Sequence, residues 1–80
     1  MSVSWILLGD QWIAEVEQVS VTVRWSRGAW HWRAVFCEGP AETAQFAGDN
    51  RQEYPNGFID AESARQSAEK WLKRLTQESS

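Results

Sequence analysis

One stretch of the chain, VSVTVRWSRGAWHWRAVF at positions 19–36, limits the possible folds more than any other. Apolar and polar residues alternate along it on both sides of Arg27-Gly28, and glycine supplies the positive φ that a two-residue hairpin turn needs. With the turn placed there, Trp25 lies opposite Trp30, and further apolar pairs fall on the same face. Those pairs are Val23 with Trp32, Val21 with Ala34 and Val19 with Phe36. A shift of one residue would set apolar side chains opposite charged ones, so the pattern predicts this register.

A second turn signal lies upstream, where Gly9-Asp10 separates two apolar segments. A two-residue turn at this point again pairs apolar residues: Leu7 with Trp12, Trp5 with Ala14 and Val3 with Val16. The alternation changes phase between residues 16 and 19, so a continuous second strand needs a bulge at Glu17-Gln18. A short helix over residues 10–17 stays open as an alternative, because apolar residues from Trp12 to Val19 also fit one helical face.

The chain downstream of the hairpin predicts one more strand, a long connection and a helix. Gly39-Pro40-Ala41 turns the chain into a short fourth strand. The predicted pairs in that strand are Phe36 with Ala44 and Ala34 with Phe46. Residues 48–59 form the connection, whose Pro55-Asn56-Gly57 is a turn signal. Asp60 is a favourable N-cap for a helix over 60–76, whose alanines and large apolar residues form one stripe.

These elements are predicted to make up one domain of 80 residues with an α+β fold. We expect an antiparallel sheet of three to four strands over about residues 3–47 and a long loop over 48–59. A C-terminal helix over about 60–76 is expected to pack on the apolar face of the sheet.

Composition narrows the possible partners and the compartment. The net charge is −3 and the pI is near 5.0, which disfavours direct binding to nucleic acid, because neutralising phosphates needs clustered Lys and Arg. The single cysteine, Cys37, excludes an internal disulfide. The N-terminus has neither the leading basic residues of a signal peptide nor an apolar run long enough to span a membrane. We therefore expect a cytoplasmic protein with no membrane partner.

Residues that could carry catalysis are too few or too far apart. His31 and Cys37 lie six residues apart on one predicted strand, which separates them by roughly 20 Å and rules out a Cys–His dyad. One His and one Cys also fall short of a four-ligand metal site, and the glycines are scattered singly rather than gathered in a phosphate-binding loop. We therefore expect no metal, no cofactor and no enzymatic activity.

Two polar patches are candidate binding sites. The first is the polar face of the hairpin, where Arg24, His31 and Arg33 suit a carboxylate-rich or phosphate-bearing partner, since arginines make paired contacts with such groups. The second is the long connection, whose candidate contact residues are Arg51, Tyr54 and Phe58. Loops of this length are often functional, and Arg and Tyr are enriched among binding hot spots.

A third patch is apolar and lies on the predicted face opposite the helix. It comprises Ile6, Leu8, Ile13, Val35 and Cys37. Apolar groups on a face that meets water indicate an interface, so we expect a homodimer or a partner contact there.

Residues spread over the hairpin, the fourth strand and the helix resemble a pattern found in small phage and mobile-element proteins. The matching residues are Trp32, Arg33, Val35, Ala44, Gly48, Glu62, Ala64, Ala68 and Glu69. The resemblance covers about half the chain, and its motifs are structural. It implies a sheet-plus-helix fold and a stoichiometric protein-binding inhibitor of a host complex, as small acidic anti-CRISPR and other anti-defence proteins are. One partner that fits is a host complex that handles nucleic acid.

Strands followed by a C-terminal helix also resemble the arm-type DNA-binding domain of phage integrases, in which the sheet lies in the major groove. The match lies at residues 30–33 and in Ser63-Ala64-Arg65 of the helix. The chain departs from that family in being acidic and in having no lysine on the predicted sheet. The alternative function that this resemblance implies is a DNA-binding accessory domain that uses its sheet face.

Overall fold

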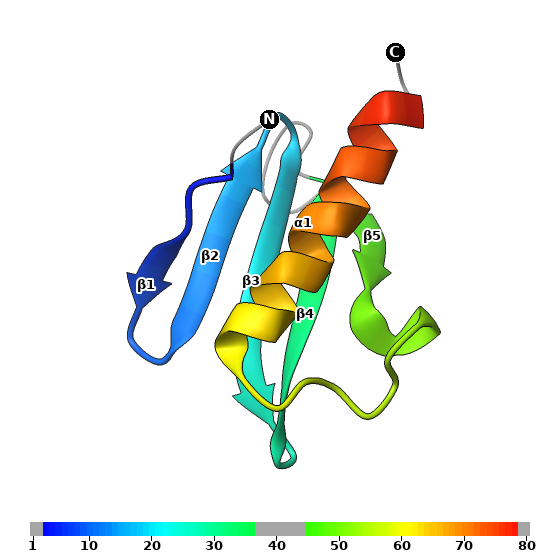
Figure 1. Cartoon of the computed structure of the whole chain (residues 1–80). Coiled ribbons are helices and arrows are strands. Elements are labelled where there is room, and N and C mark those ends of the chain that lie inside the picture. The colour runs from blue at the N-terminus through cyan, green and yellow to red at the C-terminus, as the bar shows by residue number, and fades with distance from the viewer. Residues whose placement is uncertain (1–2, 37–44, 79–80) are drawn as a thin grey trace.

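The computed structural model of the chain describes residues 3–36 and 45–78. Within them, five antiparallel strands form one sheet in chain order. The strands are β1 (Ile6–Leu8), β2 (Gln11–Val16), β3 (Val19–Ser26), β4 (Ala29–Phe36) and β5 (Gln45–Asp49). The 3-10 turn η2 (Asn50–Gln52) and the helix α1 (Ala61–Glu78) follow, and α1 lies over β3 and β4 on one face of the sheet (Figure 1). The predicted α+β class is confirmed, with five strands in place of three to four.

The hairpin of β3 and β4 has the register that its alternating pattern predicts. Trp25 pairs with Trp30, and the pairing continues without interruption from Ser26 back to Val19. Both turn residues have positive φ, 53° at Arg27 and 83° at Gly28, as a two-residue turn that follows the twist of the strands requires. The polar positions of both strands therefore lie on the face opposite α1.

Glu17 and Gln18 form a turn between β2 and β3, so the predicted bulge at this point is wrong. Val16 pairs with Val19 across the turn, and Glu17 has a φ of 55°. Residues that face each other across a two-residue turn are three positions apart and share one face, which explains the change of phase. Residues 11–16 are a strand and not a short helix, and the extra turn accounts for the fifth strand.

β1 is an edge strand of three residues, all of them exposed. Leu7 pairs with Trp12 as predicted, but the strand does not extend back to the predicted start. Trp5 contacts the helix instead, and its indole N–H donates a hydrogen bond of 3.1 Å to Glu69. The predicted pairs of Val3 and Trp5 with β2 are therefore absent from the register of these strands.

β5 pairs with β4 in a register different from the predicted one. Phe46 lies opposite Val35, and Ala34 lies opposite Gly48, with a bulge between Ala34 and Val35. A Cβ atom at Gly48 would lie only 2.9 Å from the ring of Trp71, so the glycine is needed where the helix covers the strand. The bulge places Phe46 on the outer face, where it is 53% exposed. The predicted turn at 39–41 and the pairing of Ala44 lie outside the described residues.

The core lies between α1 and the inner face of the sheet. Its buried helix residues are Ala64, Ala68 and Leu72, and its buried strand residues include Val21, Val23, Trp32 and Ala34. The two alanines let the helix backbone approach the sheet closely, and Leu72 fills the space further along the helix. Among the described residues, no helix combines the length and the apolar character needed to cross a membrane.

The helix begins at the predicted cap and continues past the predicted end at residue 76. The carboxylate of Asp60 accepts a hydrogen bond of 2.7 Å from the backbone N–H of Ser63. This backbone bond is the main reason why the pKa of Asp60 lies below its ordinary value of 3.8, with a smaller effect from Arg65. The N-cap thus holds the end of the connection in place beside the sheet.

Candidate functional site

The sheet face opposite α1 carries an open groove of about 720 Å³. Residues from β3, the β3–β4 turn, β4, β5 and the connection over residues 50–58 line it. The lining residues are Arg24, Ser26, Arg27, His31, Trp32, Arg33, Phe46, Asp49, Asn50, Arg51, Pro55 and Asn56. Four of these residues are arginines, so we call the site the arginine groove.

The register of β3 and β4 brings three of the predicted site residues together. Arg24 pairs directly with His31, and Arg33 lies two positions further along β4 on the same face. Val23, which precedes Arg24, and Trp32, which lies between His31 and Arg33, are buried beneath the helix. Because side chains alternate along a strand, burial of one set directs the other set outward into the groove.

Arg51 reaches the same groove from the connection. β5 ends at Asp49, which lies opposite Arg33 in the register of β4 and β5. Asp49 then caps η2, and its carboxylate accepts a hydrogen bond of 3.0 Å from the backbone N–H of Arg51. This cap turns the chain back beside β4, so Arg51 and Arg33 line one groove although the sequence assigned them to separate patches.

Sequence reasoning does not identify Arg27 or Phe46 as site residues. The sequence indicates Arg27 only as a turn residue. A signal was available, because the turn of a hairpin lies at the end of the face that carries Arg24 and Arg33. Phe46 is predicted to face Ala34 in the core, and the bulge in β5 brings it instead to the groove. No local signal reveals the bulge, because it depends on packing against a residue from the helix.

Asn50 ties the connection to the sheet and is the one buried polar residue among those described. Its Oδ1 accepts a hydrogen bond of 3.0 Å from the backbone N–H of Trp32, and its Nδ2 donates one of 2.8 Å to the carbonyl of Tyr54. These backbone partners determine how the amide is oriented, so its second N–H is directed at Nδ1 of His31, 3.1 Å away. In this contact the amide of Asn50 is the donor and Nδ1 of His31 is the acceptor.

Gly57 completes the contact of the connection with His31. Its φ is 81°, and a Cβ atom at this position would lie 2.8 Å from Cε1 of His31 and from Cβ of Ala29. Next to it, the backbone N–H and carbonyl of Phe58 bond to those of Trp30 at 2.8 and 2.9 Å. Only glycine lets the connection lie this close to β4.

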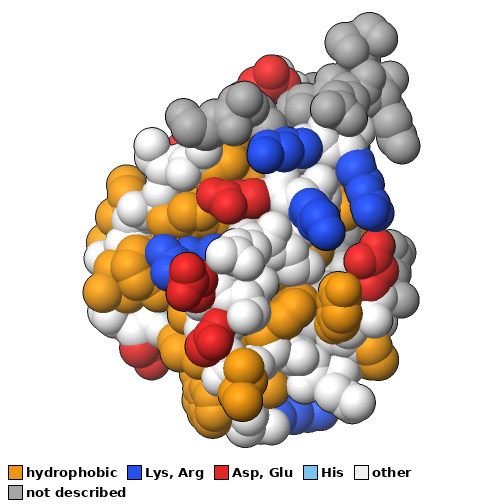
Figure 2. Space-filling model, viewed as in Figure 1, with side chains coloured by type: hydrophobic (Ala, Val, Ile, Leu, Met, Phe, Trp, Pro, Cys, Tyr) orange, Lys and Arg blue, Asp and Glu red, His pale blue; other side chains and the backbone are white. Residues whose placement is uncertain are grey.

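The arginine groove concentrates positive charge. No ion pair joins its arginines to a carboxylate within residues 3–36 and 45–78. Arg33 lies over the ring of Phe46, with 5.4 Å from the guanidinium carbon to the ring centroid. Asp49 is the single acidic residue of the lining, whereas acidic and basic side chains are interspersed on the helix-bearing face (Figure 2). Guanidinium groups in this setting can bind carboxylates or phosphates through paired N–H donors.

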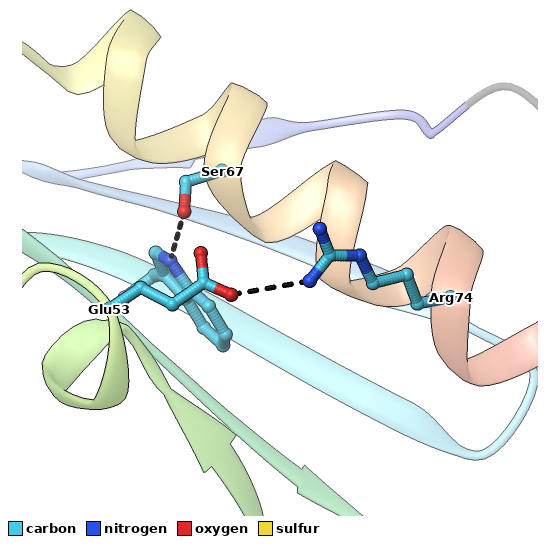
Figure 3. Close-up of polar contacts among 4 residues, drawn as sticks. Glu53, Ser67 and Arg74 are labelled. Atoms are coloured by element: carbon cyan, nitrogen blue, oxygen red, sulfur yellow. Dashed lines mark hydrogen bonds and ion pairs between the residues drawn. The ribbon is translucent and has the colours of Figure 1, made fainter.

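Tyr54 and Phe58 line a different cavity. Their ring centroids lie 5.0 Å apart, and they face α1 across a space that we call the helix–loop cleft. Its lining residues are Trp32, Asp49, Asn50, Glu53, Tyr54, Phe58, Ser63, Gln66, Ser67, Lys70, Trp71 and Arg74. Glu53 of the connection and Arg74 of the helix form an ion pair of 3.2 Å across it (Figure 3).

The apolar residues predicted for a dimer face form two separate groups. Ile6 pairs with Ile13 at the β1 edge, whereas Val35 pairs with Phe46 at the opposite side of the sheet. Polar residues of β3 and β4 lie between the two groups on the same face. Cys37 lies outside the described residues, and the dimer itself stays a prediction.

We compared the chain with protein-family models, curated proteins and solved structures, and none of the three comparisons finds a match. The resemblance to small phage proteins therefore stays a prediction.

Proposed function

We propose that this chain is a small non-enzymatic binding module that takes an acidic segment of a partner protein into the arginine groove. The observation that carries this proposal is that four arginines line one groove, none of them with a carboxylate partner among the described residues. Like charges held side by side repel each other, so a ligand that neutralises them gains binding energy from charges already in place.

The neighbours of the arginines favour a particular kind of segment. The ring of Phe46 beneath Arg33 offers an apolar surface beside the charges. Protein interfaces are often dominated by such combinations of arginine and aromatic side chains. A segment that alternates carboxylates with an apolar side chain therefore suits the groove better than a purely charged one.

Charge on the rest of the sheet face favours a protein over a nucleic acid. Glu15 is exposed on the same face of the sheet, and Asp49 lies in the groove itself. A duplex that follows the face would bring its phosphates close to both carboxylates, on a chain with a net charge of −3. A short acidic segment can occupy the groove without meeting Glu15.

The resemblance to small phage proteins suggests the biological role in which this binding would be used. It implies a stoichiometric inhibitor, similar to anti-CRISPR proteins, that occupies an acidic surface of a host complex. DNA binding through the sheet face is the second candidate, and the exposure of Arg24 and Arg33 on that face favours it.

Affinity capture from a nuclease-treated bacterial lysate tests the proposal, with the wild type, Arg33→Glu and Lys73→Glu as baits. Lys73 is exposed on α1 and does not line the groove. Lys73→Glu changes the net charge by the same amount as Arg33→Glu and therefore controls for charge alone. We expect one protein recovered in a fixed molar ratio with the wild type and with Lys73→Glu, and lost with Arg33→Glu.

Two results would contradict the proposal. One is a partner whose recovery survives Arg33→Glu. The other is the absence of any protein partner together with a shift of duplex DNA in a gel at low salt, which would favour the second candidate.

A further inference from the structure

The helix–loop cleft has the size and lining of a small-molecule site. Its volume is about 470 Å³, and such sites span roughly 300–1,000 Å³. It lies between α1 and the connection, next to the arginine groove, with which it shares Trp32, Asp49 and Asn50. Aromatic rings from the sheet, the helix and the connection all line it. Concave sites that combine aromatic rings with a few polar groups are the usual setting for small ligands.

Contacts on several sides hold the cleft in shape without a ligand. The indole N–H of Trp32 donates a hydrogen bond of 3.1 Å to Oγ of Ser67 (Figure 3), and its backbone N–H is bonded to Asn50. The ring of Trp71 lies 5.4 Å from that of Trp32 and packs on Gly48. A site that is formed in advance loses little conformational entropy on binding.

The rings that line the cleft favour a flat aromatic ligand. Tyr54 is 50% exposed and Phe58 and Trp71 are half-buried, so part of each ring surface stays accessible from the cleft. The helix presents polar side chains, such as Ser63 and Gln66, towards the cleft in place of the large apolar residues that would fill it. A planar ring can stack on the exposed aromatic surfaces, and such pairs add to the gain from burial alone.

The charges at the cleft favour an anionic substituent on that ring. Lys70 and Arg74 lie one helical turn apart, and Arg74 is paired with Glu53 at 3.2 Å. The carboxylate of Asp49 is engaged in capping η2. Lys70 forms no ion pair with a carboxylate within residues 3–36 and 45–78, so its ammonium group is available to a ligand.

We propose that the helix–loop cleft binds a small planar aromatic anion, with its ring against Trp71, Tyr54 and Phe58 and its anionic group at Lys70. Trp32, Asp49 and Asn50 line both this cleft and the arginine groove, whereas Lys70 and Trp71 line the cleft alone, so substitutions at those two residues test the cleft separately.

Titration with 2-naphthoate, followed by NMR of the indole N–H groups, tests this proposal. The chain has six tryptophans, of which Trp32 and Trp71 line the cleft. We expect the signal of Trp71 to move with a saturable dependence on concentration, and those of Trp5 and Trp25 to stay in place. Lys70→Ala should weaken binding about tenfold or more, since it removes a charge-assisted contact.

Matched controls separate this site from the proposed function. Lys73→Ala, on the same helix outside the cleft, should leave the affinity for 2-naphthoate unchanged, as should Arg33→Ala in the groove. The neutral analogue 2-naphthalenemethanol should bind the wild type and Lys70→Ala equally. The proposal is overturned if Lys70→Ala binds 2-naphthoate as the wild type does, if Arg33→Ala is the variant that loses binding, or if all indole signals move together without saturation.

Discussion

Nδ2 of Asn50 lies 3.1 Å from Nδ1 of His31, and this contact joins the connection that carries Arg51 to the strand that carries Arg33. The arginine groove is therefore assembled by a polar contact between two segments distant in sequence. Apolar packing directs the arginines of the hairpin outward, and Asn50, together with the backbone bonds between Phe58 and Trp30, holds the connection beside them.

Replacement of Asn50 by alanine should destabilise the fold by at least about 2 kcal/mol. The substitution leaves the buried backbone N–H of Trp32 without a partner. It also removes one of the two bonds that the carbonyl of Tyr54 accepts, the other coming from the backbone N–H of Gly57. Each buried polar group that loses its partner costs about 1–3 kcal/mol. Urea denaturation followed by circular dichroism measures the loss. Asn56→Ala in the same connection is the control, because Asn56 is exposed, and its effect should stay within about 0.5 kcal/mol.

Gly48→Ala should cost about 1–3 kcal/mol, the usual effect of an extra methyl group in a packed site. The added Cβ would lie 2.9 Å from the ring of Trp71, closer than real contacts allow. In a Trp71→Leu background the same substitution should cost much less, because the ring that it meets is gone. A double-mutant cycle with no coupling between the two positions would contradict this account of β5.

Glu17→Gly should stabilise the chain by about 0.5–1 kcal/mol. Glu17 has a φ of 55°, a region that costs a residue with a side chain about 1–3 kcal/mol, and glycine avoids that cost at some loss of chain entropy. Gln18→Gly, in the same turn but without a positive φ, should destabilise instead. Thermal unfolding should therefore show a higher midpoint for Glu17→Gly and a lower one for Gln18→Gly, and shifts of the same sign would contradict a left-handed conformation at Glu17 alone.

The stability that Asp60 contributes should decrease as the pH is lowered into the acidic range. Its pKa in the folded chain lies below 3.8, chiefly because of the bond from the backbone N–H of Ser63. The contribution is therefore present above pH 3.8 and is lost as the pH falls through the folded pKa. Asp60→Ala should unfold at a lower temperature than the wild type at pH 7, and the difference should shrink at acidic pH. A difference that is constant or grows towards low pH would be inconsistent with the cap.

Local patterns suffice to predict the β3–β4 hairpin and the start of α1. The hairpin has a glycine in its turn and alternation over both strands, and the helix has Asp60 before a regular apolar stripe. The turn at Glu17-Gln18 lacks glycine, so the same pattern is interpreted there as a bulge. The turn can still be recognised from two apolar residues three positions apart, Val16 and Val19, that flank the two polar residues Glu17 and Gln18.

Contacts between distant segments account for what sequence reasoning misses. The register of β5 depends on how Gly48 packs against Trp71, and the position of Arg51 depends on the bonds of Asn50 to the sheet. Neither contact is accompanied by a periodic pattern of apolar residues in the sequence from which it could be predicted. Arg24, His31 and Arg33 could thus be predicted to share one face, whereas Arg27, Phe46 and the approach of Arg51 required the structure.

NMR of the arginine Nε–H groups tests most directly whether the arginine groove binds an acidic segment, as we propose. The probe is a short peptide in which glutamates flank a phenylalanine, and its glutamine counterpart is the control. We predict saturable shifts at Arg24, Arg27, Arg33 and Arg51 with the glutamate peptide alone. Arg65, which stacks on Trp12, and Arg74, which pairs with Glu53, should stay in place. Shifts confined to Arg65 and Arg74, or equal binding of both peptides, would contradict the claim.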